Sequence, residues 1–201
     1  SPRVVCLACD GKGGVWAGTE NGIAHLEMIS MTLEEKADWF FDTTEKYYPR
    51  KDGFVTWLGG IKGNDLSTAG VSEISDNDGL WTQMYITSLS YKYAVTKDKK
   101  ALEAARRSMK AMLLLTKAPE IKGFTARAVR YPDEPSFGKG LEEQAEGAEW
   151  HRSSDGTYEW LGETSSDEMT GHFNGFSIYY DLCANKAEKK EICEAVCNIV
   201  D

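Results

Sequence analysis

The sequence of 201 residues predicts a mainly α-helical protein that begins with a short antiparallel β segment. Two observations lead to this prediction. Apolar residues recur at helical spacing in five stretches after Thr32, whereas residues 3–26 alternate β-forming runs with turn dipeptides. Because 41% of the residues are hydrophobic, the chain can bury one sizeable core or two small ones.

The charge and hydropathy of the chain exclude two kinds of partner. The formal net charge is −9, and the lysines are scattered along the sequence, so we expect no nucleic-acid partner. The longest apolar run, Met112 to Leu115, is far shorter than the roughly 20 residues that a transmembrane helix needs. We therefore expect no membrane span.

Residues 1–30 are predicted to form the β segment, with three short strands between residues 3 and 26. Asp10-Gly11 and Asn21-Gly22 are dipeptides typical of tight hairpin turns. Over about 24 residues this stretch resembles one repeat of the β-propellers of two-component regulators, in which Val-Trp-x-Gly-Thr is followed by Gly-Ile. A propeller needs about four or more such blades, so this segment is either one repeat of a longer parent chain or a small sheet packed on the helices.

The first predicted helix covers residues 32–48. Thr32 and Glu35 form a capping-box pattern at its start, and Pro49 ends it. Residues 49–75 are rich in Gly and Asp, which predicts a long loop with one short strand around residues 54–58.

The second half of the chain repeats a helical hairpin. Residues 80–95 and 99–115 form the first pair of predicted helices, and sliding the sequence by 89 positions superimposes this pair on residues 167–184 and 187–200. Both pairs open with a Ser/Asp-rich turn. In each pair the first helix is apolar around most of its circumference, which predicts an inner position, and the second is amphipathic, which predicts an outer one.

This organisation of residues 31–201 resembles the α/α toroids of carbohydrate-active enzymes, the glycoside hydrolases and polysaccharide lyases. The resemblance implies a partial α/α toroid of inner–outer hairpins, completed by the rest of a longer chain or by a second copy. It also implies an oligosaccharide or another small molecule as ligand and favours a periplasmic or extracellular location.

The acids in the two turns are the candidate catalytic groups. Asp76, Asp78, Asp167 and Glu168 are all predicted at helix N-termini, where capping explains at least one acid in each turn but does not require two. Glycoside hydrolysis uses paired carboxylates, so we predict Asp78 and Asp167 as the acid/base pair. Two carboxylates about 5–10 Å apart at the floor of an open cleft would favour hydrolysis, and binding would be favoured if every one of these acids and Glu163 were bonded to backbone amides.

Two further groups are substitutes for that pair. Glu163 precedes the second turn, and His172 lies near the start of the helix that follows. Together with Tyr131 and an arginine, this histidine would suit lyase chemistry, in which a base removes the proton beside the carboxylate of a uronate sugar. A single helical histidine is also a common core residue.

The long predicted loop 116–164 is dense in aromatic and charged residues, unlike a solvated linker. Tryptophan and tyrosine stack on sugar rings, and arginine suits carboxylated sugars. The alternative is that the tryptophans only pin the loop. The predicted substrate-binding residues are Asp76, Trp81, Arg127, Tyr131, His151, Trp160 and Glu168.

No motif indicates a cofactor or a bound metal. Cys6, Cys9, Cys193 and Cys197 are predicted to be small buried side chains and not a zinc site, and the odd number of cysteines, five, leaves the redox compartment open. Phosphate-binding, serine-hydrolase, zinc-protease and EF-hand patterns are incomplete in this sequence. A non-catalytic sensor or interaction module that binds a glycan or a protein is the alternative function.

Overall fold

The computed structural model describes residues 3–62, 65–70, 74–75, 77–134 and 149–201. Helices make up about half of this part of the chain, and two small antiparallel sheets accompany them. The predicted fold class is therefore confirmed as mainly helical with an N-terminal antiparallel strand segment.

The chain divides into two compact units, Ser1–Trp39 and Phe40–Asp201, which we call the N-terminal unit and the helical unit. Helix α1 (Leu33–Tyr47) begins in the first unit and ends in the second. The predicted capping box is present at its start, because Glu35 N donates to Thr32 Oγ1 and Thr32 N donates to Glu35 Oε2.

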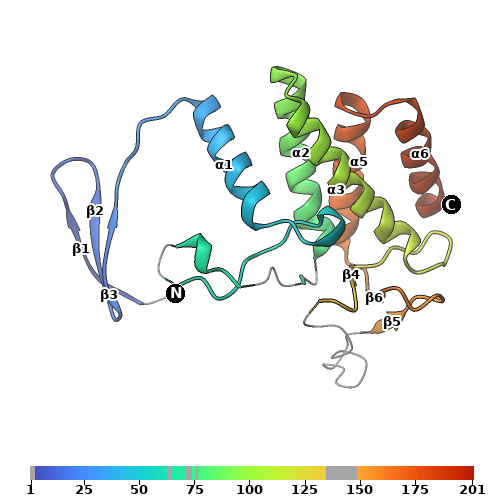
Figure 1. The fold of residues 1–201 in the computed structure, drawn as a ribbon, viewed down its shortest axis with the longest axis horizontal. Helices are drawn as coiled ribbons and strands as arrows, with labels where there is room; N and C mark the ends of the chain where they lie inside the picture. The colour runs from blue at the N-terminus through green and yellow to red at the C-terminus, as the bar shows by residue number, and fades with distance from the viewer. Residues whose placement is uncertain (1–2, 63–64, 71–73, 76, 135–148) are drawn as a thin grey trace. The chain divides into compact units, whose positions relative to one another are not determined.

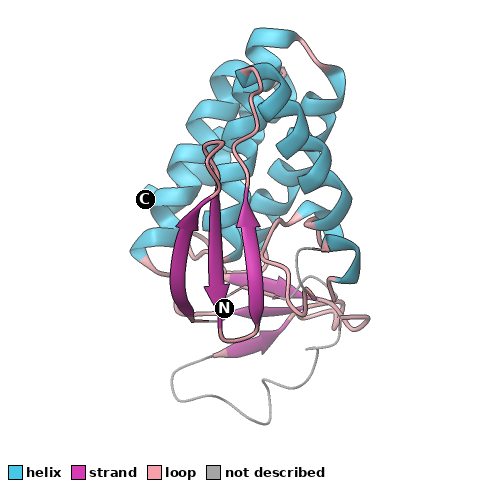
Figure 2. Ribbon diagram, turned by 90° about the vertical axis from the view of Figure 1, so that its left-hand side faces the viewer, coloured by secondary structure: helices cyan, strands magenta, loops and turns pink. Residues whose placement is uncertain are grey.

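The N-terminal unit contains the three predicted strands, β1 (Val4–Cys9), β2 (Val15–Thr19) and β3 (Gly22–Leu26), drawn as the long magenta arrows in Figure 2. They pair in sequence order, so β2 is central. The connection between β1 and β2 takes positive φ at Gly11 and Gly13, and Gly22 supplies it where β3 begins. These glycines thus allow the chain to reverse between the strands.

Two helical hairpins form the helical unit (Figure 1). The first consists of α2 (Asp78–Thr96) and α3 (Lys99–Lys117), and the second of α5 (Ser166–Leu182) and α6 (Lys186–Val200). Short polar turns with side-chain caps from Asp98 and Asn185 join each pair.

Helices α2 and α5 pack side by side and run in the same direction. Gly79 at the start of α2 contacts Glu168 at the start of α5, and one turn further on Gln83 accepts a hydrogen bond from Asn174. The offset of 89 between the two hairpins also superimposes buried positions of the two helices. These pairs are Gly79/Glu168, Thr82/Gly171, Gln83/His172, Ile86/Gly175 and Ser90/Tyr179.

The core of the helical unit lies between the four helices and the loop that precedes α2. Phe54 from that loop is fully buried among helix residues. Its segment is pinned by Ser108, which donates to Gly53 O at 2.8 Å, and by Thr82, which accepts from Val55 N at 3.1 Å. The largest fully buried apolar side chains from the helices are Ile86, Leu89, Met112, Leu115, Phe176 and Tyr179.

Two parts of the predicted loops are different in the structure. Residues 54–58 do not form the expected strand: a 3-10 turn at Lys51–Gly53 precedes them, and Val55 makes an isolated bridge with Pro49. The expected loop 116–164 contains a sheet of β4 (Ala128–Arg130), β6 (Glu159–Leu161) and β5 (Trp150–Arg152), with β6 in the centre. Three-residue strands leave too little periodicity to be recognised in a sequence.

The prediction that the cysteines are buried is wrong. All five are free thiols, Cys183 is half-buried, and the other four are exposed. Cys6 and Cys9 belong to β1, whose residues are all exposed, and Cys193 lies next to the buried Ile192 but on the outer face of α6. Among the described helices, none is both long and apolar enough to cross a bilayer.

We expect Gly171→Ala to destabilise the protein by about 1–3 kcal/mol, because an added Cβ would lie 3.0 Å from both Leu80 Cα and Gln83 Cγ across the α2–α5 contact. Alanine normally favours a helix over glycine, so intrinsic helix propensity predicts the opposite sign. Urea unfolding measures the difference. Gly70→Ala is the control, since the nearest atom to its added Cβ would be 3.6 Å away; an equal loss in both variants would contradict the packing argument.

Candidate functional site

The N-terminus of α2 is capped by a side chain from another helix. Asn77, at the N-cap position, makes no side-chain capping bond. Glu168 takes this role from α5, because its carboxylate oxygens accept hydrogen bonds from Gly79 N and Leu80 N, each at 3.0 Å. Glu168 is fully buried.

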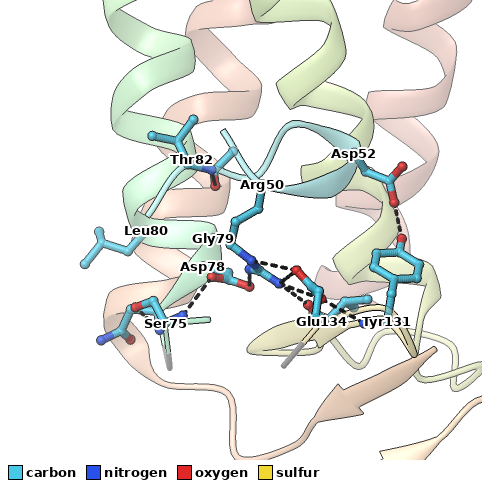
Figure 3. Close-up of polar contacts among 12 residues, drawn as sticks. Arg50, Asp52, Ser75, Asp78, Gly79, Leu80, Thr82, Tyr131 and Glu134 are labelled. Atoms are coloured by element: carbon cyan, nitrogen blue, oxygen red, sulfur yellow. Dashed lines mark hydrogen bonds and ion pairs between the residues drawn. The ribbon is translucent and has the colours of Figure 1, made fainter. Parts of the chain in front are cut away.

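Beside this cap, Arg50 lies between two carboxylates (Figure 3). Its Nη1 donates to Asp78 at 2.7 Å, and its Nε and Nη2 donate to Glu134 at 3.0 and 2.9 Å. Nη2 also donates to Val129 O on β4 at 2.8 Å. The Arg50 and Asp78 side chains are almost fully buried, so their ion pair is shielded from water. Through these contacts Arg50 connects the loop before α2 to the start of α2 and to the small sheet.

Burial shifts the protonation of both buried acids. It raises the pKa of Asp78 to about 6, although Arg50 and the Ser75 amide favour the carboxylate, and the nearby Glu134 adds to the rise. Burial likewise raises the pKa of Glu168 to about 7, against the stabilising effect of the Leu80 amide, and the charge of Asp78 adds to it. Both acids therefore take up a proton at a higher pH than free carboxylic acids do.

His172 completes the buried polar group. Its Nδ1 lies 2.8 Å from the backbone carbonyl of Glu168, which can only accept, so Nδ1 carries the proton and Nε2 is a bare acceptor. Nε2 is buried and has no hydrogen-bond partner among the described residues. Burial lowers the pKa of His172 to about 4, so the ring is neutral.

The sheet β4–β6–β5 lies at the end of the helical unit where α2 and α5 begin (Figure 1). On one face of this sheet the exposed His151 stacks on the buried Trp160, with ring centroids 4.2 Å apart. The half-buried Arg127 reaches from the same sheet towards the helix starts, where it donates to Asn77 Oδ1 at 3.3 Å and to Glu163 O at 3.4 Å.

The opposite face of the sheet carries a charged ladder. Arg130 and Arg152 both donate to the buried Glu159, at 2.7 and 3.1 Å, and the Arg130 guanidinium lies 3.7 Å from the centre of the Trp150 ring. Nearby, Tyr131 donates a hydrogen bond to Asp52, and this contact together with burial raises the pKa of the phenol.

The predicted site residues thus separate into two groups. Asp78, Glu168 and His172 are buried and hydrogen-bonded within the protein, and Trp160 is buried in the sheet, where its ring packs on His151. A second group remains accessible at the same end of the helical unit. It consists of Trp81, Asp167, Glu163 and His151, with Arg127 and Tyr131 half-buried. Asp76 lies outside the described residues.

The sequence analysis missed Arg50 and Glu134, which organise the buried group. Arg50 sits in a loop without periodicity, 28 residues before Asp78 and 84 before Glu134. The one local signal was its position next to Pro49 at the end of a helix. The pairing of Arg130 with Glu159 was missed for the same reason, because the two residues are 29 positions apart.

Within the described ranges, no cluster of three or more His, Cys, Asp or Glu side chains is arranged to hold a metal ion. A scan of protein-family models, a search of curated proteins and a search of solved structures find no match to this chain.

We expect Arg50→Met to cost about 3–5 kcal/mol of unfolding free energy, because it leaves buried Asp78 without its cation. Chemical denaturation measures this loss, and the double variant with Asp78→Asn should recover part of it. Lys51→Met is the matched control: it removes the neighbouring exposed ion pair with Asp133 and should cost less than about 1 kcal/mol. Equal costs at the two positions would refute the structural role of Arg50.

The buried titratable groups predict a pH dependence with opposed contributions. The pKa values of Asp78 and Glu168 are higher in the folded protein than in the unfolded chain, where they lie near 4. Their contribution to the unfolding free energy is therefore fully present below about pH 4 and is lost as the pH rises through about 6 for Asp78 and about 7 for Glu168. The lowered pKa of His172 gives stability that is present above its unfolded value near pH 6.5 and is lost as pH falls through about 4.

His172→Asn should remove the second contribution. On going from pH 7 to pH 5, the unfolding free energy of this variant should rise relative to that of the wild type by about 2 kcal/mol. Denaturant titrations at the two pH values measure the change. His151→Asn, which replaces an exposed histidine, is the control, and parallel pH profiles of wild type and His172→Asn would contradict the assignment.

Proposed function

We propose that the helical unit binds an oligosaccharide at the end where α2 and α5 begin. The observation that carries the proposal is the division of the site residues. The acids Asp78 and Glu168 are bonded to Arg50 and to backbone amides, whereas aromatic, imidazole and acidic side chains lie exposed around them. Carboxylates used in this way favour binding over cleavage.

The exposed groups have the chemistry that sugars require. Trp81, with 46% of its surface exposed, offers an apolar ring face at the first turn of α2. His151 is held flat by its stack on Trp160, so a ligand meets a preordered ring. The exposed carboxylates of Asp167 and Glu163 can accept hydrogen bonds from hydroxyl groups.

Cleavage is the second candidate, and one observation favours it. Glu163 is not a glycine, yet its φ of 52° places it in the left-handed region, four residues before the exposed Asp167. Backbone strain of this kind is concentrated at functional sites. In this version of the function, Asp167 and Glu163 take the acid and base roles first given to Asp78 and Asp167.

We also propose that the two hairpins are part of an α/α toroid. The same direction of α2 and α5, and the contact between the equivalent positions Gly79 and Glu168, support a repeating array of inner helices. The apolar face of α2 that includes Met84, Tyr91 and Val95 is half or more exposed, as expected for an inner helix whose further neighbours belong to the rest of a longer chain or to a second copy.

We expect the 201-residue protein to bind at least one member of an oligosaccharide panel, and His151→Ala and Trp81→Ala each to weaken that binding about tenfold, equivalent to 1.4 kcal/mol. Calorimetry measures binding, and a reducing-end assay on the same samples measures cleavage. Glu103→Gln removes an exposed acid on α3 and is the control for the Asp167→Asn variant used below.

The outcomes separate the candidates. Binding without release of reducing ends supports the proposed binding function, and release that disappears in Asp167→Asn supports cleavage instead. A panel without any bound oligosaccharide, or one bound equally well by all variants, would eliminate both.

A further inference from the structure

The N-terminal unit holds an exposed tryptophan in a fixed position. Trp16 lies on the central strand β2 and is 45% exposed. Its ring stacks on His25 of β3, with centroids 3.9 Å apart and planes within 12° of parallel. On the other side its cross-strand neighbour is the small Ala8 of β1, so one indole face is covered by His25 and the neighbouring strand places little bulk beside the ring.

His25 is held in turn by the first hairpin turn. Its Nε2 donates to Asp10 Oδ2 at 2.9 Å, and Asp10 Oδ1 accepts hydrogen bonds from Lys12 N and Gly14 N at 2.7 and 2.8 Å. The two turn amides and the His25 N–H bond lower the pKa of Asp10. The turn therefore fixes the carboxylate, the carboxylate fixes the imidazole, and the imidazole fixes the indole.

These residues border a cavity of about 410 Å³, which we call the Trp16 cavity. Lys12 and Glu27 contribute an exposed ammonium group and a carboxylate to the same lining as Trp16 and His25. A cavity of this volume is within the range of small-molecule sites.

The mixture of groups selects the ligand. The lining holds one ammonium group, from Lys12, and two carboxylates, from Glu27 and Asp10, so an anion is repelled on balance, and the ammonium offsets part of the attraction of a cation. A neutral sugar ring has an apolar C–H face for the indole and hydroxyl groups that both donate to carboxylates and accept from an ammonium. We propose that the Trp16 cavity is a second carbohydrate site, specific for neutral sugar rings and independent of the site in the helical unit.

The test uses the complete 201-residue protein and four neutral probes: maltohexaose, cellohexaose, mannohexaose and xylohexaose. We expect at least one probe to bind in calorimetry, and Trp16→Ala to raise its dissociation constant at least tenfold. Trp57→Ala removes another exposed indole, 51% exposed in the helical unit, and should change the constant less than twofold. Binding of none of the probes, or equal effects of the two substitutions, would overturn the proposal.

A measurement without substitution covers the case in which Trp16→Ala disturbs the sheet. In protein labelled with 5-fluorotryptophan, the fluorine signal of Trp16, assigned with Trp16→Phe, should shift in a saturable way with the bound probe. No shift at saturating probe would overturn the proposal. His151→Ala distinguishes the two sites: binding that survives this variant but not Trp16→Ala belongs to the Trp16 cavity, and the reverse result refutes this proposal while leaving that for the helical unit intact.

Discussion

The helical unit depends on one carboxylate that serves a helix other than its own. The first backbone amides of a helix have no hydrogen-bond acceptor within the helix. Asn77, the residue before α2, does not provide an acceptor through its side chain. Glu168 reaches across from α5 and accepts from two of these amides. This contact fixes the direction and register of α5 against α2, and it requires glycine at position 79, because a Cβ there would overlap both Glu168 and His172.

Placing Glu168 inside the protein determines what surrounds it. A buried carboxylate needs compensation, and the nearby Asp78 and Glu134 add two more acids. Arg50 is the guanidinium that both of these acids share, and its planar group can satisfy the two carboxylates and a carbonyl at once, which a lysine cannot. Burial is the main cause of the raised pKa values of Asp78 and Glu168, and repulsion from the neighbouring acids adds to the rise.

Sequence reasoning succeeded where the signal is local. The three strands, the capping box of α1 and the four later helices follow from turn dipeptides, caps and periodicity within a few residues. The contacts of Arg50, by contrast, join residues 28 and 84 positions apart, and no local pattern encodes them. The burial of residues such as Cys6 was predicted wrongly. The residue type indicates a preference for the interior, but it does not indicate which face of a strand packs against another part of the protein.

The acidic turn occurs once in each hairpin, and its acids have a different structural role in each. Both acidic turns begin the first helix of a hairpin, but they are not used alike: Asp78 of the first turn is paired with Arg50, and Glu168 of the second caps α2. Each turn therefore commits one acid to structure. In the second turn Asp167 remains exposed beside its buried neighbour, because successive helical residues point in directions about 100° apart. In the proposed site, Asp167 therefore belongs to a stretch of backbone that the buried Glu168 already fixes before a ligand binds.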